Sequence, residues 1–349
     1  MSLTEYINNK LHEMKNIYDH EGSFSLLLRV PIHALSTLFI QLEKKHPTSS
    51  GKLLNYIIKL NIISSEILSD YHINSLLDRG IGNEFHFERL KQKKSSDTIF
   101  VLGSGSSIND ISDKRWEYIN SNDSIGLNRW PIHEHVPTFH VYETPGNRNH
   151  EFRKEFYKLL QYKKNEYQDV PVIIKSINRT EKFLDKKDMP KWVAEDAYLS
   201  KDTSLPDLPN TKEMYQEIMT YLLKNDYYAA NSEPEMYYHN RGSISYIIHL
   251  LVSLDYDNIV LCGVDMVNSK YFFDDKKYMQ SEIPIPIAES VKRDDVHKTV
   301  DENIAEVTLE DVIYTLNREV LEKEGIHLYV ENTISALHPK IPKIDHVNK

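Results

Sequence analysis

The chain has a single cysteine and an excess of acidic residues, and both features exclude classes of protein. Cys262 is the only cysteine among 349 residues, so no disulfide can form within the chain and a cysteine-rich zinc site is excluded. We therefore expect a reducing compartment. There are 42 Lys and Arg against 52 Asp and Glu, a formal net charge of −10. This balance argues against nucleic acid as a partner and leaves room only for a local basic pocket.

Long hydrophobic runs are also missing. No stretch reaches the roughly 18 uncharged apolar residues that a membrane-spanning helix needs, and the opening MSLTEYINNKLHEMKNIYDHEG lacks the apolar core of a signal peptide. We therefore expect a cytoplasmic protein, and peripheral membrane contact stays open.

Residues 1–95 have the periodicity of helices. Ile57, Leu60, Ile63 and Ile67 recur at steps of three and four residues, which places them on one face of a helix. The pattern predicts a helical N-terminal subdomain. Its role is open between a packed cap, a surface for homo-oligomer formation and a membrane-docking surface.

From residue 96 to residue 349 the pattern changes to short β-branched runs that alternate with helical stretches. The runs are TIFVLG, DSIGLN, TFHVYE, VPVIIKS, NIVLCGVD and IHLYVE. Strands separated by helices predict an α/β fold, namely a Rossmann-like, mostly parallel sheet with helices on both faces. Polar segments at about 180–235 and 274–300 are interpreted as lids or insertions rather than as sheet.

A glycine-serine turn, Gly103 to Ser107, follows the first of these strands and precedes the helical spacing of INDISDKRWEYI. Glycines at such a turn let a ligand approach the backbone, and free N–H groups with the helix dipole favour a phosphate. The dinucleotide fingerprint needs a glycine where Ile108 stands, and no Gly-Lys-Ser/Thr follows. A nucleotide or phosphate site and a merely tight turn both stay open.

Other polar residues stand where later strands end. Asn128 follows the second strand and Glu143 the third, while Gly242-Ser243 begins an apolar helix. The carboxyl ends of parallel strands are where open α/β folds bind ligands. A further strand ends at Asp265, and Tyr271 and His297 come after it.

The order of these motifs resembles that of the bacterial CMP-sialic acid transferases of glycosyltransferase family 42. It resembles more distantly the domain-of-unknown-function family 115, which includes CMP-nonulosonate transferases. The similarity covers about residues 97–337 and consists of GSGSS, GLN, RGSIS, GVD, YFF and HKTVDE, in the family's order.

The resemblance implies a metal-independent, inverting transfer of a sialic acid-type sugar from a CMP-sugar to a glycan or lipid-linked glycan, with no metal or other cofactor. It implies that the nucleotide is bound by Gly103, Ser104, Gly105, Ser106, Ser107, Asn128, Gly242, Ser243 and Asp265. Tyr271 would hold the phosphate and His297 would be the general base, since an imidazole titrates near working pH. Glu143 is the reserve base.

Three departures from the family pattern, at Ser104, Glu143 and Val267, leave the donor open among sialic, pseudaminic, legionaminic and Kdo sugars. Three other interpretations also stay open: a metal-dependent nucleotide-sugar transferase using Asp274-Asp275, a pterin pyrophosphokinase-like diphosphate transferase, and a non-enzymatic scaffold. Trp130 is expected either to pack in the core or to line the pocket.

Overall fold

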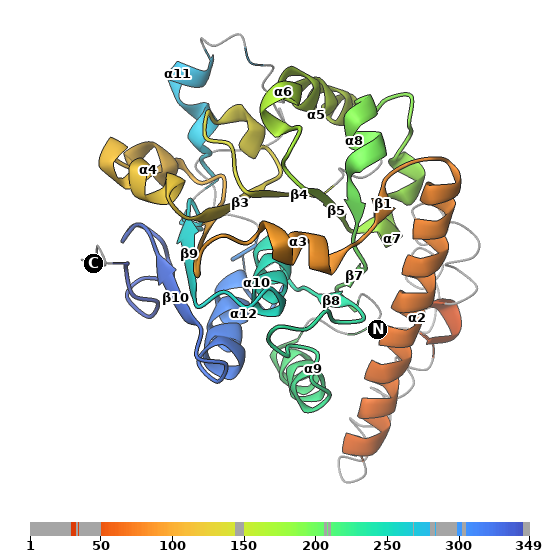
Figure 1. Cartoon of the computed structure of the whole chain (residues 1–349). Helices are drawn as coiled ribbons and strands as arrows, with labels where there is room; N and C mark the ends of the chain where they lie inside the picture. The colour runs from red at the N-terminus through yellow and green to blue at the C-terminus, as the bar shows by residue number, and fades with distance from the viewer. Residues whose placement is uncertain are drawn as a thin grey trace.

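The computed structural model describes residues 29–32, 34, 50–143, 150–205, 208, 211–267, 269–279, 283, 299–301 and 305–344. Its centre is an eight-stranded, all-parallel sheet in the order β1-β6-β5-β4-β3-β2-β9-β10 (Figure 1). The strands are β1 (Asn83–Glu84), β2 (Thr98–Leu102), β3 (Asp123–Leu127), β4 (Phe139–Glu143), β5 (Val172–Lys175), β6 (Tyr198–Leu199), β9 (Asn258–Cys262) and β10 (His327–Val330). All six predicted strands are confirmed, and with them the α/β fold class.

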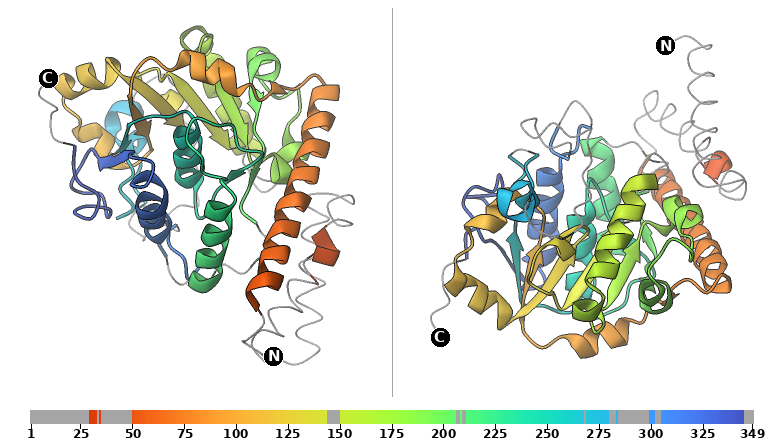
Figure 2. Two further views of the ribbon diagram at one scale, coloured as in Figure 1. Left: turned by 60° about the horizontal axis from the view of Figure 1, so that its bottom comes forward. Right: turned by 90° about the horizontal axis from the view of Figure 1, so that it is seen from above.

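Helices cover both faces of the sheet (Figures 1 and 2). The α-helices are α2 (Ser50–Asp78), α3 (Phe87–Lys93), α4 (Asp113–Asn120), α5 (His150–Tyr162), α6 (Lys164–Tyr167), α7 (Ile177–Thr180), α8 (Lys191–Asp196), α9 (Lys212–Lys224), α10 (Ser243–Ser253), α11 (Lys276–Met279) and α12 (Leu309–Leu316). Short 3₁₀ turns are η1 (Ser106–Asp110), η2 (Trp130–Ile132), η4 (Glu181–Phe183) and η5 (Phe272–Asp274), and the π-helical turn η6 (Asn317–Leu321) follows α12. A separate pair of short parallel strands, β7 (Asp202–Thr203) and β8 (Tyr237–Tyr238), lies beside the sheet.

The alternation of residues along each strand divides the core into two layers. Ile99 and Val101 of β2 face the layer of α9, α10 and α12, whereas Phe100 and Leu102 face the layer of α4, α5 and α8. Both sets are fully buried, because a parallel sheet covered on two sides needs apolar residues at every position. The β-branched runs in the sequence reflect this double burial.

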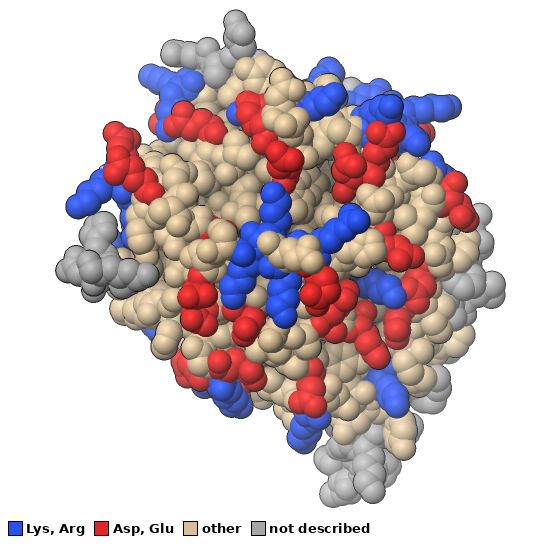
Figure 3. Space-filling model, in the orientation of Figure 1, with Lys and Arg blue, Asp and Glu red and all other residues tan. Residues whose placement is uncertain are grey.

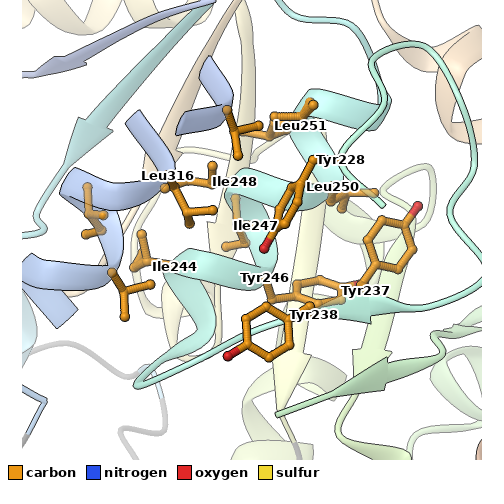
Figure 4. Close-up of a cluster of buried hydrophobic side chains, with 14 of the residues drawn as sticks. Tyr228, Tyr237, Tyr238, Ile244, Tyr246, Ile247, Ile248, Leu250, Leu251 and Leu316 are labelled. Atoms are coloured by element: carbon orange, nitrogen blue, oxygen red, sulfur yellow. The ribbon is translucent and has the colours of Figure 1, made fainter. Parts of the chain in front are cut away.

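Helix α10 is buried along its whole length, within the core layer that also contains α9 and α12 (Figure 4). Its apolar residues pack against Leu316 and against a group of tyrosines that includes Tyr228, Tyr237 and Tyr238. Burying one such large side chain contributes roughly 1.5–3 kcal/mol. The N-terminus of α10 is thereby fixed at the edge of the sheet where the strands end.

Two short strands correct the predicted organisation. Residues 198–199 form β6 inside the main sheet, paired with β1, where Asn83 lies opposite Tyr198. The interpretation of 180–235 as lid rather than sheet was therefore wrong at these residues, since a two-residue strand has no detectable periodicity. The predicted boundary near residue 95 runs through a shared core, because Leu54 and Ile58 of α2 pack in the same cluster as the sheet.

Much of the remaining predicted organisation lies outside the described residues. This applies to most of residues 1–49 and to most of the segment 274–300. Among the helices that the structure describes, none combines the length and the apolar content needed to cross a bilayer.

Candidate functional site

A cleft of about 650 Å³ opens at the carboxyl edge of the parallel sheet. It lies at the point where the chain order reverses: β3, β4 and β5 extend from one side of β2, and β9 and β10 lie on the other side. Open α/β sheets bind their ligands at such a reversal. The cleft is lined by nine of the predicted site residues, namely Gly103, Ser104, Gly105, Asn128, Glu143, Gly242, Ser243, Asp265 and Tyr271.

Three predicted site residues are not part of this lining. Ser106 and Ser107 turn away from the cleft into η1, and Ser107 is buried. His297 lies outside the described residues, although nearby Thr299 lines the cleft. The structure therefore says nothing about the position of His297.

The glycines of the first turn make room for a neighbouring backbone. The Gly103 amide donates to the carbonyl of Cys262 at 2.8 Å, and the Gly105 amide donates to the carbonyl of Gly263 at 2.8 Å. A Cβ atom added to Gly103 would lie 2.6 Å from the Gly263 carbonyl oxygen. The absence of side chains, predicted to let an anion approach, is thus required by the contact between the loops after β2 and β9. In the described part of the chain, the Ser104 amide has no hydrogen-bond partner.

The helix predicted directly after this turn is only a five-residue 3₁₀ turn, η1, and the α-helix starts later, at Asp113. The chain leaves the helical conformation at Ile111, which is extended with φ of −73° and ψ of 120°. One carboxylate oxygen of Asp265 accepts from the Ser107 amide at 2.9 Å, and the other accepts from the Ser107 hydroxyl. Both oxygens of Asp265 therefore fasten the loop after β9 to η1. That makes Asp265 a support of the cleft wall, not a free ligand group.

Asn128 connects the ends of β3 and β4. Its backbone is left-handed, with φ of 50°, a conformation that asparagine tolerates better than most residues. Its side-chain oxygen accepts from the Glu143 amide at 2.9 Å, and its own amide donates to the carbonyl of Val141 at 2.9 Å. The side-chain NH₂ group is what Asn128 offers to a ligand, and the acceptor half of the predicted nucleotide contact is already used.

Glu143 lies in a cluster of charged and polar side chains that was not predicted from the sequence. Lys175 is only 1% exposed, and its Nζ lies 3.0 Å from Oε2 of Glu143. Arg179 approaches Oε1 at 3.2 Å, and the Ser243 hydroxyl donates to Oε2 at 2.8 Å. The sequence signal was available, because the β5 run VIIK ends on a lysine at the carboxyl edge of the sheet.

These partners decide the protonation state of Glu143. Burial alone would raise its pKa, but Lys175 and Arg179 outweigh burial and hold the pKa of this carboxyl well below its usual range. A carboxylate that is this strongly stabilised accepts a proton poorly. The geometry therefore weakens the reserve role of Glu143 as a general base and favours a role in positioning Lys175.

A second polar pair, Asp202 and His239, stands behind this cluster. Asp202 comes from β7, and His239 directly follows β8. The Nε2 atom of His239 lies 2.9 Å from Oδ2 of Asp202, and the Ser176 amide donates to Oδ1 at 2.6 Å. His239 reaches the cleft lining, whereas Asp202 does not. Neither residue was singled out from the sequence, because β7 and β8 are too short to recognise there.

Tyr271 is held opposite the first glycine turn. It forms an isolated antiparallel bridge with Gly105, and the next residue, Phe272, donates its amide to the Ser104 carbonyl at 3.0 Å. The two aspartates of the metal-dependent alternative accept backbone hydrogen bonds nearby: Asp274 from the Tyr271 amide at 2.8 Å and Asp275 from the Lys277 amide at 2.9 Å. Within the described residues there is no group of three or more His, Cys, Asp or Glu side chains that could hold a metal ion.

Trp130 packs in the core and does not line the cleft. It is fully buried, stacks on His133 with ring centres 4.7 Å apart, and donates from Nε1 to the His135 carbonyl at 3.0 Å. Of the two roles left open for this residue, packing is therefore correct.

The cleft carries a local surplus of positive charge. Its charged lining consists of Lys175, Arg179, Arg241 and Lys270 against Glu143 and Asp265, so 4 − 2 = 2 formal positive charges. Burial also raises the pKa of Asp265. The N-terminus of α10, at Gly242-Ser243, adds a partial positive charge. In a chain of net charge −10, these features indicate an anionic ligand.

A second group of basic side chains lies on the protein surface, over α3 (Figure 3). Helix α3 and the residue after it carry Arg89, Lys91, Lys93 and Lys94. Acidic residues surround this group in the same view.

Comparison of the sequence with protein-family models and with curated proteins found no match.

Proposed function

We propose that the protein is a CMP-sugar-dependent glycosyltransferase that transfers a sialic acid-type sugar, a nonulosonate or Kdo, to a glycan hydroxyl. One observation carries this proposal: the motifs that resemble the sialic acid transferases meet in one cleft, and that cleft has a cationic surplus. A CMP-nonulosonate has a phosphate and a carboxylate, so two negative charges would match the two surplus positive charges.

The residues of the cleft suit the departure of a phosphate. Preorganised donors aimed at developing charge are usually the largest single contribution to catalysis. The Ser104 amide, the Tyr271 hydroxyl and the N-terminus of α10 would be such donors, because Ser104, Tyr271 and Ser243 line the cleft from three different segments of the chain. They would stabilise the leaving cytidylate while an acceptor hydroxyl attacks the anomeric carbon from the opposite side, which inverts its configuration.

A cytoplasmic location, a lipid-linked or other glycan acceptor and a peripheral membrane contact belong to the same proposal. The acceptor would lie beside Thr299 and Leu309, which line the cleft.

The test is ligand binding followed by turnover. Thermal unfolding is measured with CMP, CDP, ATP and UDP, and CMP is expected to raise the melting temperature, because a ligand that binds only the folded state stabilises by RT ln(1 + [L]/Kd). CMP release is then measured from CMP-sialate, CMP-pseudaminate, CMP-legionaminate and CMP-Kdo, with and without EDTA. We expect EDTA to leave the activity unchanged.

Two matched variants test whether CMP binds in the cleft. Tyr271→Phe removes one cleft hydroxyl and is expected to weaken CMP binding, whereas Tyr329→Phe on β10 removes a hydroxyl outside the cleft lining. Stabilisation by ATP without any by CMP would favour the diphosphate transferase instead. No stabilisation by any of the four nucleotides would contradict the proposal.

A further inference from the structure

The Asp202–His239 pair has the arrangement of a proton acceptor held by a carboxylate. The pKa of Asp202 is lowered despite its burial, chiefly through its hydrogen bond to His239. Asp202 is therefore ionised, and its Oδ2 accepts a hydrogen bond from Nε2 of His239. Nε2 of His239 therefore carries the ring hydrogen, and the lone pair of the neutral ring is left on Nδ1. Within the described residues Nδ1 makes no hydrogen bond, and this atom is not fully enclosed by the protein. His239 lines the cleft and also the small cavity beside it, so its imidazole stands at the cleft wall.

The surroundings of His239 keep the ring neutral. Burial lowers its pKa, and the nearby cations Lys175 and Arg179 lower it further, which outweighs the opposing effect of Asp202. Three elements of the fold contribute these groups: Lys175 ends β5, Arg179 lies on α7 and Asp202 on β7. Two more charged groups face the pair, namely Glu143 of β4 and Arg29, which lines a small cavity of about 30 Å³ beside it.

We propose that His239, oriented by the Asp202 carboxylate, is the general base that deprotonates the acceptor hydroxyl in the cleft. The inference rests on the proposed transfer reaction and assigns a base from the described part of the chain. Asp202 is a positioning residue, because it acts only through the imidazole.

The step conserves atoms and charge. The acceptor oxygen forms a bond to the anomeric carbon, and the bond from that carbon to the phosphate oxygen breaks, with its electron pair leaving on cytidylate. The hydroxyl proton passes to Nδ1 of His239. The resulting imidazolium is stabilised by Asp202 at a distance of 2.9 Å and returns the proton to solvent after the product leaves.

Substitution of His239 by Gln tests the assignment. The Gln amide can still donate to Asp202 but has no basic nitrogen, so the turnover number is expected to fall by about 10²- to 10⁴-fold, with CMP affinity kept within about twofold of wild type. Asp202→Asn is expected to lower turnover and to move the acidic limb of the pH–rate profile, an effect that a purely structural role would not produce. His327→Gln, on the exposed end of β10, is the control and should leave turnover unchanged.

The outcomes separate this inference from the proposed function. Near-normal turnover of His239→Gln would overturn the role of His239 and leave the transferase proposal standing. Failure of the wild-type protein to bind CMP would sink the transferase proposal instead. In that case the imidazole NMR signals of His239 still decide: a neutral ring protonated on Nε2 from pH 6 to 8 supports a base, and a ring that is charged at pH 7 contradicts it.

Discussion

The two halves of the cleft are built in opposite ways. On the side of β2 and β9, backbone meets backbone: Gly103 and Gly263 lie so close that a Cβ atom would clash. On the side of β4 and β5, charged side chains fill the edge, with Lys175 buried against Glu143. The first half supplies shape and backbone groups, and the second supplies charge and titratable groups.

This difference shows that the most conspicuous sequence motif does not mark the residues that supply the charge of the site. The glycine turn is conspicuous in the sequence, yet its glycines are required mainly by loop packing. The charged half has no recognisable motif, yet it holds the buried lysine and the Asp202–His239 pair. We expect substitutions in the first half to act on stability through steric contact, and those in the second half to act through charge.

The largest effect is expected from Lys175→Met, which removes the buried cation but keeps an unbranched side chain that is only one atom shorter. Breaking a buried ion pair typically costs about 3–5 kcal/mol. The cost should lie near the lower end of that range, because Glu143 keeps Arg179 and Ser243 as partners. Urea unfolding measures the loss.

Lys191→Met is the matched control for that substitution. Lys191 is 83% exposed and lies 3.7 Å from Glu195 on the surface of α8, so its loss should change stability by less than about 0.5 kcal/mol. Equal stability of the two variants would show that the charged half is not held by its buried pair.

Acid should destabilise the protein through its buried histidines and not through Glu143. Burial, as the main cause, lowers the pKa of His133 and His140 to about 3 and that of His249 to about 4. The unfolded chain binds these protons near pH 6.5 and the folded chain does not, so stability is complete above that pH and falls below it. From pH 7 to 5.5 each histidine should remove about 1 kcal/mol.

Glu143 should not contribute in this window, because its pKa lies well below the usual range and its ion pairs persist at pH 5.5. Calorimetric melting between pH 7 and 5.5 should show a loss of at least about 3 kcal/mol from these three histidines, to which His135 adds, because burial lowers its pKa to about 4. A flat profile would mean that these rings are protonated in the folded state.

Gly103→Ala tests the steric half. The new Cβ would lie 2.6 Å from the Gly263 carbonyl oxygen, which is fixed backbone, so a loss of about 1–3 kcal/mol is expected. Gly242→Ala places a Cβ no closer than 3.6 Å to any neighbour, in extended backbone with φ of 175°. Its stability should stay within about 0.5 kcal/mol of wild type. Similar unfolding midpoints for both variants would contradict the steric argument.

The smallest effect is expected from Ser243→Ala at the junction of the two halves. Its hydroxyl donates to Glu143 at 2.8 Å, and a hydrogen bond to a charged acceptor contributes about 1.5–3 kcal/mol at most. Because Lys175 and Arg179 remain on the same carboxylate, about 1 kcal/mol should be lost. An unchanged unfolding midpoint would show that the ion pairs alone position Glu143.

Much of the fold was predictable from local patterns. The six longer strands were recognisable because double-sided burial fills them with apolar residues, as in the run from Ile99 to Leu102. Strands β1 and β6 were not, since two residues have no period. The α-helix predicted after Ser107 is interrupted at Ile111, which is extended, and the α-helix begins only at Asp113. The bonds from Ser107 to Asp265, 158 positions further along the chain, had no local signal either.

The sequence by itself determined the parallel α/β sheet, the edge at which its polar residues gather and the lack of any disulfide. These follow from composition, strand periodicity and the direction of parallel strands, which are local properties of the chain. Only the tertiary structure decided that Lys175 is buried against Glu143, that Asp202 orients His239, and that Gly103 faces Gly263. Such pairs join residues far apart in sequence, and their energies depend on burial and distance, which no local pattern encodes.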